Sequence, residues 1–182
     1  GQEDRLLIST DNGASFSSST PFTAEEINGV AYTNQTWIVT YTKSGETNLF
    51  ARTAANSDLT TWSAEVNLGI DKPVNKDNDN TPDARASLAA SLGRVVIVSN
   101  KIAAIARLDV SGTSTSNLAN PTYSGANIRD IATDGVTWMI VTVDADIYES
   151  TDSGATFSQT VDDIRGTARD LQTVTASKHL PL

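Results

Sequence analysis

An eight-residue motif occurs twice in this chain and sets a repeat length. Residues 9–16 (STDNGASF) and 150–157 (STDSGATF) differ at only two positions, one of which exchanges Ser for Thr. A shortened relative lies at 56–62, and the aspartates at 11, 58 and 152 are 47 and 94 residues apart, or one and two periods. A decayed fourth copy is expected at 107–112. A period of this length indicates stacked supersecondary units, each too small to bury its apolar face alone.

A second element recurs between the copies of the motif. Residues 30–40, 88–98 and 131–141 each read as a strand, a short polar turn and a second strand rich in β-type residues, which predicts a hairpin. One complete unit is therefore strand, turn, strand, loop, strand, motif, strand. Four-stranded antiparallel units are expected over about 26–67, 85–118 and 127–161.

The two ends of the chain complete the count. Residues 5–18 hold only a final strand pair with its motif, and 167–182 hold only an opening strand. Together they make a fourth unit, since four periods of 47 residues come close to the 182 present. We expect one domain over 1–182. The alternative is an arc of a larger ring whose remaining units come from other chains or were cut away.

The motif S-x-D-x-G-x-[ST]-[WF] resembles the Asp-box, or BNR repeat, of sialidase-like β-propellers. In that family the box is a tight hairpin between the third and fourth strands of a blade. The resemblance implies an all-β fold, a small β-propeller of about four four-stranded antiparallel blades, with the N- and C-terminal strands sharing one blade.

The residues of the boxes have expected structural roles. The carboxylates accept backbone N–H bonds in the turn, the glycines supply a positive φ, and the aromatic rings anchor the turn between neighbouring sheets. The set comprises Asp11, Gly13, Phe16, Asp58, Trp62, Asp152, Gly154 and Phe157. None of these residues is expected to be catalytic.

Charge and composition exclude several classes of function. With 13 basic and 22 acidic residues the formal charge is -9, which disfavours nucleic acid and anionic membrane surfaces as partners. No apolar run approaches the roughly 20 residues of a membrane span, so we expect no membrane insertion. The absence of cysteine excludes a disulfide, a thiolate zinc site and a cysteine nucleophile, and one histidine disfavours a histidine triad.

The polar segment between the first two units carries a candidate metal site. Asp77, Asp79, Thr81 and Asp83 alternate in the pattern D-x-D-x-T-x-D, and alternate oxygen ligands on a curled loop suit Ca²⁺. The run also resembles the calcium repeats of thrombospondin type 3, lacking one of their acidic residues and their glycine. The other interpretation is a solvated acidic loop with two turn prolines. No further cofactor is expected.

Three arginines fall at comparable inner-strand positions: Arg85, Arg129 and Arg169. In sialidases an arginine triad clamps the substrate carboxylate through bidentate bonds. The resemblance makes these residues candidates for ligand binding. However, the F-R-I-P arginine motif of sialidases is absent, and no Tyr–Glu nucleophile pair is recognisable.

These features together favour a binding function over an enzymatic one. The Asp-box family includes secreted glycosidases, photosystem assembly factors, sorting receptors and phage virion proteins, so the fold does not decide the activity. We expect a non-enzymatic extracellular module on a virion or bacterial surface, which contacts protein partners, sister subunits or glycans. The alternative is a sialidase-like glycoside hydrolase or a fragment of one.

Overall fold

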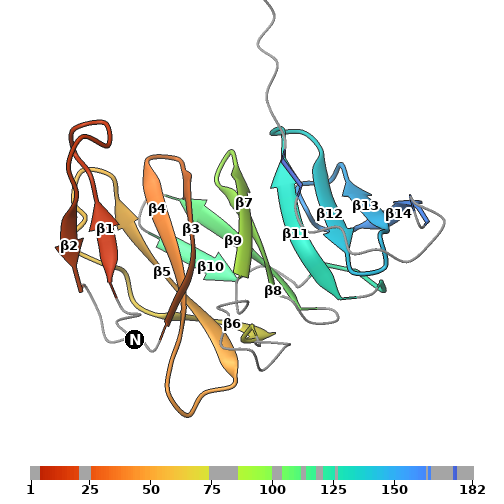
Figure 1. Cartoon of the computed structure of the whole chain (residues 1–182), viewed down its shortest axis with the longest axis horizontal. Helices are drawn as coiled ribbons and strands as arrows, with labels where there is room; N and C mark the ends of the chain where they lie inside the picture. The colour runs from red at the N-terminus through yellow and green to blue at the C-terminus, as the bar shows by residue number, and fades with distance from the viewer. Residues whose placement is uncertain are drawn as a thin grey trace, which may run out of the picture.

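All regular structure in the described part of the chain is β, which confirms the predicted all-β class. The computed structural model describes residues 5–20, 26–73, 86–99, 104–111, 114–117, 121–125, 127–162, 164 and 174–175. Within these ranges fourteen strands form four antiparallel sheets (Figure 1). No helix long and apolar enough to cross a membrane occurs among these residues.

Three of the sheets have four strands each, in sequence order from one edge to the other. The first sheet comprises β3 Glu26–Thr33, β4 Thr36–Thr42, β5 Asn48–Ala55 and β6 Val66–Asp71. The second comprises β7 Ala86–Ser91, β8 Arg94–Ser99, β9 Ile105–Ser111 and β10 Ser114–Asn117. The third comprises β11 Ile128–Thr133, β12 Trp138–Thr142, β13 Ile147–Ser150 and β14 Ser158–Val161. The N-terminal hairpin comprises β1 Leu6–Ile8 and β2 Ser17–Ser19.

The three predicted hairpins are confirmed as β3–β4, β7–β8 and β11–β12. Two of them close through two-residue turns in which both residues have positive φ: Asn34 and Gln35 at 46° and 58°, and Leu92 and Gly93 at 47° and 80°. Such turns match the right-handed twist of the flanking strands, which explains a tight turn at Leu92 although leucine rarely adopts this conformation.

The sheets are stacked face to face in chain order. Their first strands lie side by side, β3 next to β7 and β7 next to β11 (Figure 1). Hydrogen bonds also tie the turns of neighbouring sheets together: Gly93 N donates to Thr33 Oγ1 at 2.9 Å, and Ser91 Oγ donates to the Gly135 carbonyl at 3.4 Å.

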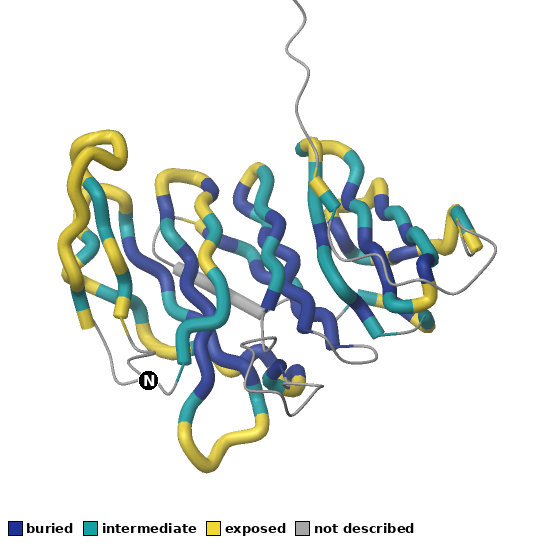
Figure 2. The backbone as a smooth tube through the Cα atoms, in the orientation of Figure 1, coloured by how far each residue is buried: buried dark blue, intermediate teal, exposed yellow. Residues whose placement is uncertain are grey.

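The central sheet buries apolar side chains on both of its faces. Val95 and Ile97 of β8 belong to the core shared with the first sheet, whereas Val96 and Val98 belong to the core shared with the third. Successive side chains of a strand point to opposite faces, so one continuous apolar run serves two interfaces. Figure 2 shows burial concentrated between the sheets, while the N-terminal hairpin is mostly exposed.

The fourth copy of the motif, expected at 107–112, does not form a box turn, and closure of the four units into a ring is not seen among the described residues. Asp109, in the decayed fourth motif, lies within β9 and forms an ion pair with Arg94 at 2.6 Å. The strand continues to Ser111 and β10 begins at Ser114, which leaves no room for a box turn. The described sheets form an open series rather than a closed ring, and 167–182 lie outside the described residues except 174–175.

Gly29 tests the packing of β3 against β7. A Cβ at this position would overlap Leu88 Cδ1 and come within 2.7 Å of the Ala86 carbonyl oxygen. We expect Gly29→Ala to lower the free energy of unfolding by about 2–3 kcal/mol, because overpacking forces the strands apart. Gly45→Ala is the control: it meets no atom within 4 Å, and its φ of 78° should cost about 1 kcal/mol. Urea unfolding measures both, and equal losses would contradict this packing.

Candidate functional site

The box of the third sheet is a turn organised by one carboxylate. Asp152 accepts hydrogen bonds from Ser150 Oγ at 2.7 Å, from the backbone N–H groups of Ala155 and Thr156 at 2.9 Å, and from Thr156 Oγ1 at 2.6 Å. Ser150 Oγ in turn accepts a bond from Gly154 N at 3.0 Å. These contacts are all local in sequence, so the motif itself specifies the turn.

This box also packs against the preceding sheet. Gly154 has a φ of 76°, and a Cβ there would overlap Val96 Cγ2 of the second sheet. Phe157 is buried in the core between the second and third sheets. The glycine therefore permits both the turn conformation and the close approach of the turn to its neighbour.

The N-terminal box has closely similar internal bonds but no such packing. Asp11 accepts bonds from Ser9 Oγ at 2.7 Å, Ser15 N at 2.9 Å and Ser15 Oγ at 2.6 Å. Gly13 has a φ of 84°, yet nothing lies within 4 Å of a Cβ built there. Phe16 is exposed, so it does not anchor this turn as Phe157 anchors the other.

The third turn is shorter and has no glycine. Asp58 accepts bonds from Thr60 N at 2.9 Å, Thr61 N at 3.2 Å and Thr60 Oγ1 at 2.6 Å. The indole of Trp62 donates to the Leu59 carbonyl at 3.1 Å and is half-buried. This turn is a tighter relative of the two full boxes.

The hydrogen bonds of the boxes lower the pKa of each central carboxyl. The bond from the Ser15 side chain is the largest cause at Asp11, whose pKa falls to about 2. The Thr60 side chain is the largest cause of the lowered pKa of Asp58. At Asp152, burial would raise the pKa, but the bonds from Thr156, Ser150 and Ala155 together outweigh it and lower the pKa. Donors that favour the charged form explain all three shifts.

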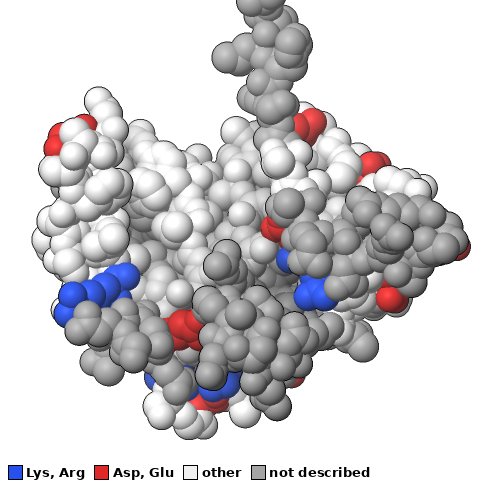
Figure 3. Space-filling model, in the orientation of Figure 1, with Lys and Arg blue, Asp and Glu red and all other residues white. Residues whose placement is uncertain are grey.

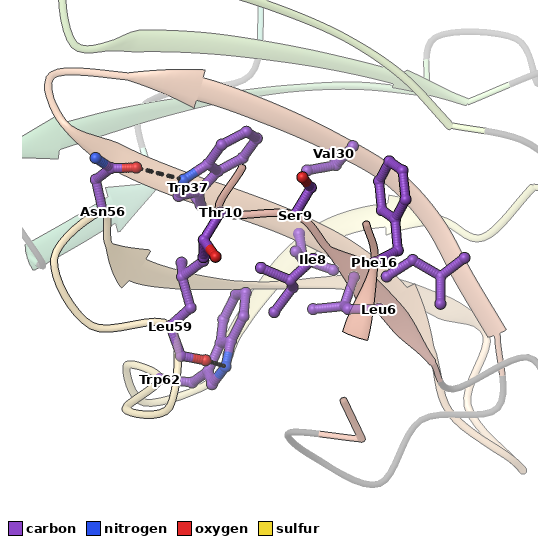
Figure 4. A pocket seen from close by; sticks show the side chains of 12 residues that line it. Leu6, Ile8, Ser9, Thr10, Phe16, Val30, Trp37, Asn56, Leu59 and Trp62 are labelled. Carbon is purple, nitrogen blue, oxygen red and sulfur yellow. Dashed lines mark hydrogen bonds between the residues drawn. The ribbon is translucent and has the colours of Figure 1, made fainter. Parts of the chain in front are cut away.

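A hollow of about 540 Å³ lies between the N-terminal hairpin and the first sheet (Figure 4). We call it the N-terminal groove. Its lining is Leu6, Leu7, Ile8, Ser9, Thr10, Phe16, Val30, Trp37, Val39, Asn56, Leu59 and Trp62.

The N-terminal groove is apolar and uncharged. None of its twelve described lining residues carries a charge, and only Ser9, Thr10 and Asn56 have polar side chains apart from the indoles. Trp37 donates its indole N–H to Asn56 Oδ1 at 2.9 Å (Figure 4). Figure 3 shows a mostly uncharged surface over the hairpin and the first sheet, with the charged side chains toward its margins.

Exposed apolar residues gather at this end of the molecule. Leu7, Phe16 and Val30 expose 68%, 62% and 55% of their surface. The residues at the matching positions of the third unit are Tyr148, Phe157 and Ile131, which expose 7%, 7% and 4%. The same repeat positions are thus buried against a four-stranded preceding sheet, and exposed where the described preceding unit is only the two-stranded hairpin or where no preceding sheet is described. Exposed patches of this kind mark interaction sites more often than isolated apolar residues do.

The remaining predicted site residues are mostly outside the described residues. Arg85 and Arg169 lie there, as do the calcium candidates Asp77, Asp79, Thr81 and Asp83. Arg129 is half-buried on β11, beside Asp130, whose Oδ2 accepts a bond from Val174 N at 2.9 Å. The arginine and calcium sites stay predictions. In the described part of the chain no three metal-ligating side chains come together.

The N-terminal groove was not found by sequence reasoning. Tryptophans at repeated positions, such as Trp37 and Trp62, normally pack between sheets, and this interpretation hides their role as groove walls. The available signal was the incomplete unit at 5–18, because a missing inner strand pair leaves the apolar face of the next unit uncovered. No protein-family model matches the chain, and no curated protein matches it either.

The charge of Asp152 should stabilise the fold in a pH-dependent way. We expect Asp152→Asn to lower the free energy of unfolding by about 1–2 kcal/mol at pH 7, since hydrogen bonds to the charged carboxylate weaken. The folded pKa lies below the unfolded value of about 3.9, so this contribution is complete above about pH 4 and declines as the pH falls further. Variant and parent should therefore converge towards pH 2.

Asp11→Asn is the matched control for this change. It removes the same type of charge from a box that packs against no described sheet, so its effect on global unfolding should be smaller. Chemical denaturation between pH 7 and pH 2 measures both variants. A difference for Asp152→Asn that stays constant over this range would show that its charge is not responsible.

Proposed function

We propose that this chain is a non-enzymatic binding and assembly module of an extracellular or virion surface, built as an Asp-box β-propeller. Three observations support the architecture: the side-by-side order of β3, β7 and β11, the four-stranded antiparallel sheets, and the packing of Gly154 against the preceding sheet. In this proposal each four-stranded sheet is a blade, and residues 5–18 share a fourth blade with 167–182.

Val174 supports the assignment of a fourth blade. Its backbone N–H donates to Asp130 Oδ2 on β11 at 2.9 Å. Val174 and Thr175 also line a small hollow with Ala132 and Met139, on the face of the third sheet that points away from the second. This is the side on which the opening strand of a following blade would lie.

The exposed apolar residues of the N-terminal end carry the functional proposal. The residues of the third unit that correspond to Leu7, Phe16 and Val30 are buried. A partner that covers these three side chains would therefore bury surface that a complete pair of sheets buries. Protein partners or sister subunits suit this apolar surface best. Glycans are the second class, because Trp37 and Trp62 offer aromatic faces for stacking.

Sedimentation velocity tests the assembly function. We expect the chain to form species above the monomer mass as its concentration rises, and Phe16→Ser to shift the distribution towards monomer. Val136→Ser is the control, because Val136 is equally exposed but lies in the β11–β12 turn.

A glycan array and a panel of fluorogenic glycosides complete the test. A strict monomer that also binds no glycan on the array would contradict the proposed function. Turnover of a glycoside would instead establish the hydrolase alternative.

The calcium site is a separate part of the proposal. If Asp77, Asp79, Thr81 and Asp83 bind Ca²⁺, millimolar Ca²⁺ should raise the melting temperature by mass action. The Asp77→Asn, Asp79→Asn double variant should lose this rise, and Mg²⁺ is the control ion. A melting temperature unchanged by Ca²⁺ would dismiss the site.

A further inference from the structure

The N-terminal groove runs along an unpaired strand edge. In the three complete sheets the third strands, β5, β9 and β13, each pair with a neighbour on both sides. β1 precedes its box as β13 does, but in the described part of the chain it pairs only with β2. Its other edge borders the groove and pairs with no described strand, so its backbone groups can pair with an added strand.

The complete sheets show what fills the equivalent position. In the second sheet it is β8, whose Val95 and Ile97 pack against the preceding sheet and whose Val96 and Val98 pack against the following one. In the third sheet it is β12, with Trp138 and Ile140 buried against the second sheet. A strand in the groove would need large apolar side chains at alternate positions, on the face that packs against the first sheet.

The chemistry of the walls selects a peptide over a sugar. Leu6 and Ile8 on one side and Val30, Trp37 and Val39 on the other offer an aliphatic and aromatic slot. The formal charge of the chain is -9, yet none of the described lining residues is charged. An uncharged apolar strand therefore enters without leaving a charge buried, whereas a sugar would find few hydrogen-bonding side chains.

The chain's own last residues are poorly suited to this position. Leu171–Thr175 is the remaining β-type run after the third sheet, and its Val174 already contacts Asp130 on β11. The seven residues that follow in this sequence include Lys178, His179 and Pro181. Lys178 and His179 are basic and do not suit an uncharged groove, and Pro181 has no backbone N–H to donate to a β-ladder.

We propose that the N-terminal groove is a strand-acceptor site, which takes an extended, uncharged apolar segment of a partner protein as an added strand along β1. Main-chain hydrogen bonds to β1 would give affinity, and alternate apolar side chains would fill the slot. The inference rests on the proposed architecture, because it treats β1 as the third strand of an incomplete unit.

A peptide taken from the chain itself tests the site. Residues 95–99 (VVIVS), with two C-terminal lysines for solubility, reproduce the uncharged part of the strand that fills the equivalent place in the second sheet and contain no tryptophan. We expect saturable binding to the full chain, a blue shift of the emission of Trp37 and Trp62, and slower hydrogen exchange at Leu6–Ile8. A peptide with prolines at the positions of Val96 and Val98 should bind at least tenfold more weakly.

A matched pair of variants locates the binding. Val30→Asp places a charge in the groove at an exposed position, so the variant should fold and bind the peptide at least tenfold more weakly. Val136→Asp changes a still more exposed valine outside the groove and should bind as the parent does. Circular dichroism spectra of both variants, compared with that of the parent, check that they are folded.

Three results would overturn the proposal. The first is no binding of the peptide at millimolar concentration, and the second is equal binding of the proline peptide, which would indicate non-specific apolar contact. The third is binding that appears only after residues 176–182 are deleted, which would assign the groove to the chain's own end. None of these results alters the sedimentation or glycan-array outcome, so failure here is distinguishable from failure of the proposed function.

Discussion

The structure depends on sheets that must be covered on both faces. In the second sheet, neighbouring valines of β8 point to opposite sides, and each side is buried against another sheet. A four-stranded unit of this kind cannot exclude water from its core alone, because half of its apolar residues face outwards on each side. The stability of any one unit is therefore a property of its two neighbours.

The ends of the series show this dependence directly. Ile131 and Val30 occupy the same repeat position, yet Ile131 packs against a four-stranded sheet and is buried, whereas Val30 faces only the two-stranded N-terminal hairpin and is exposed. The difference lies in the neighbour and not in the residue type, since both are β-branched and apolar. The exposed apolar residues of the N-terminal end thus occupy repeat positions that are buried in the core elsewhere in the structure. This explains why several large apolar side chains are exposed at that end.

Sequence reasoning succeeded where the determining contacts are local. The hairpins at 34–35 and 92–93 follow from short turns between β-type runs, and the box turns form from hydrogen bonds within a few residues of Asp11 and Asp152. It failed where the answer depends on a distant element. Asp109 matches the decayed motif by spacing, but the β9 strand and its ion pair with Arg94 override that pattern. The groove was missed because Trp37 reads as a packing residue whether or not its neighbour is present.

The two full boxes separate turn formation from packing. Asp11 and Asp152 accept the same kinds of bonds, although one box is packed and the other is not. The turn therefore does not need its neighbour, whereas Phe16 and Phe157 differ completely in burial. A turn whose hydrogen bonds are all local presents its aromatic residue and the adjoining strand in the same way whether or not a neighbour covers them. For this reason the incomplete N-terminal unit, and not the buried centre of the series, is where a partner can add to the fold.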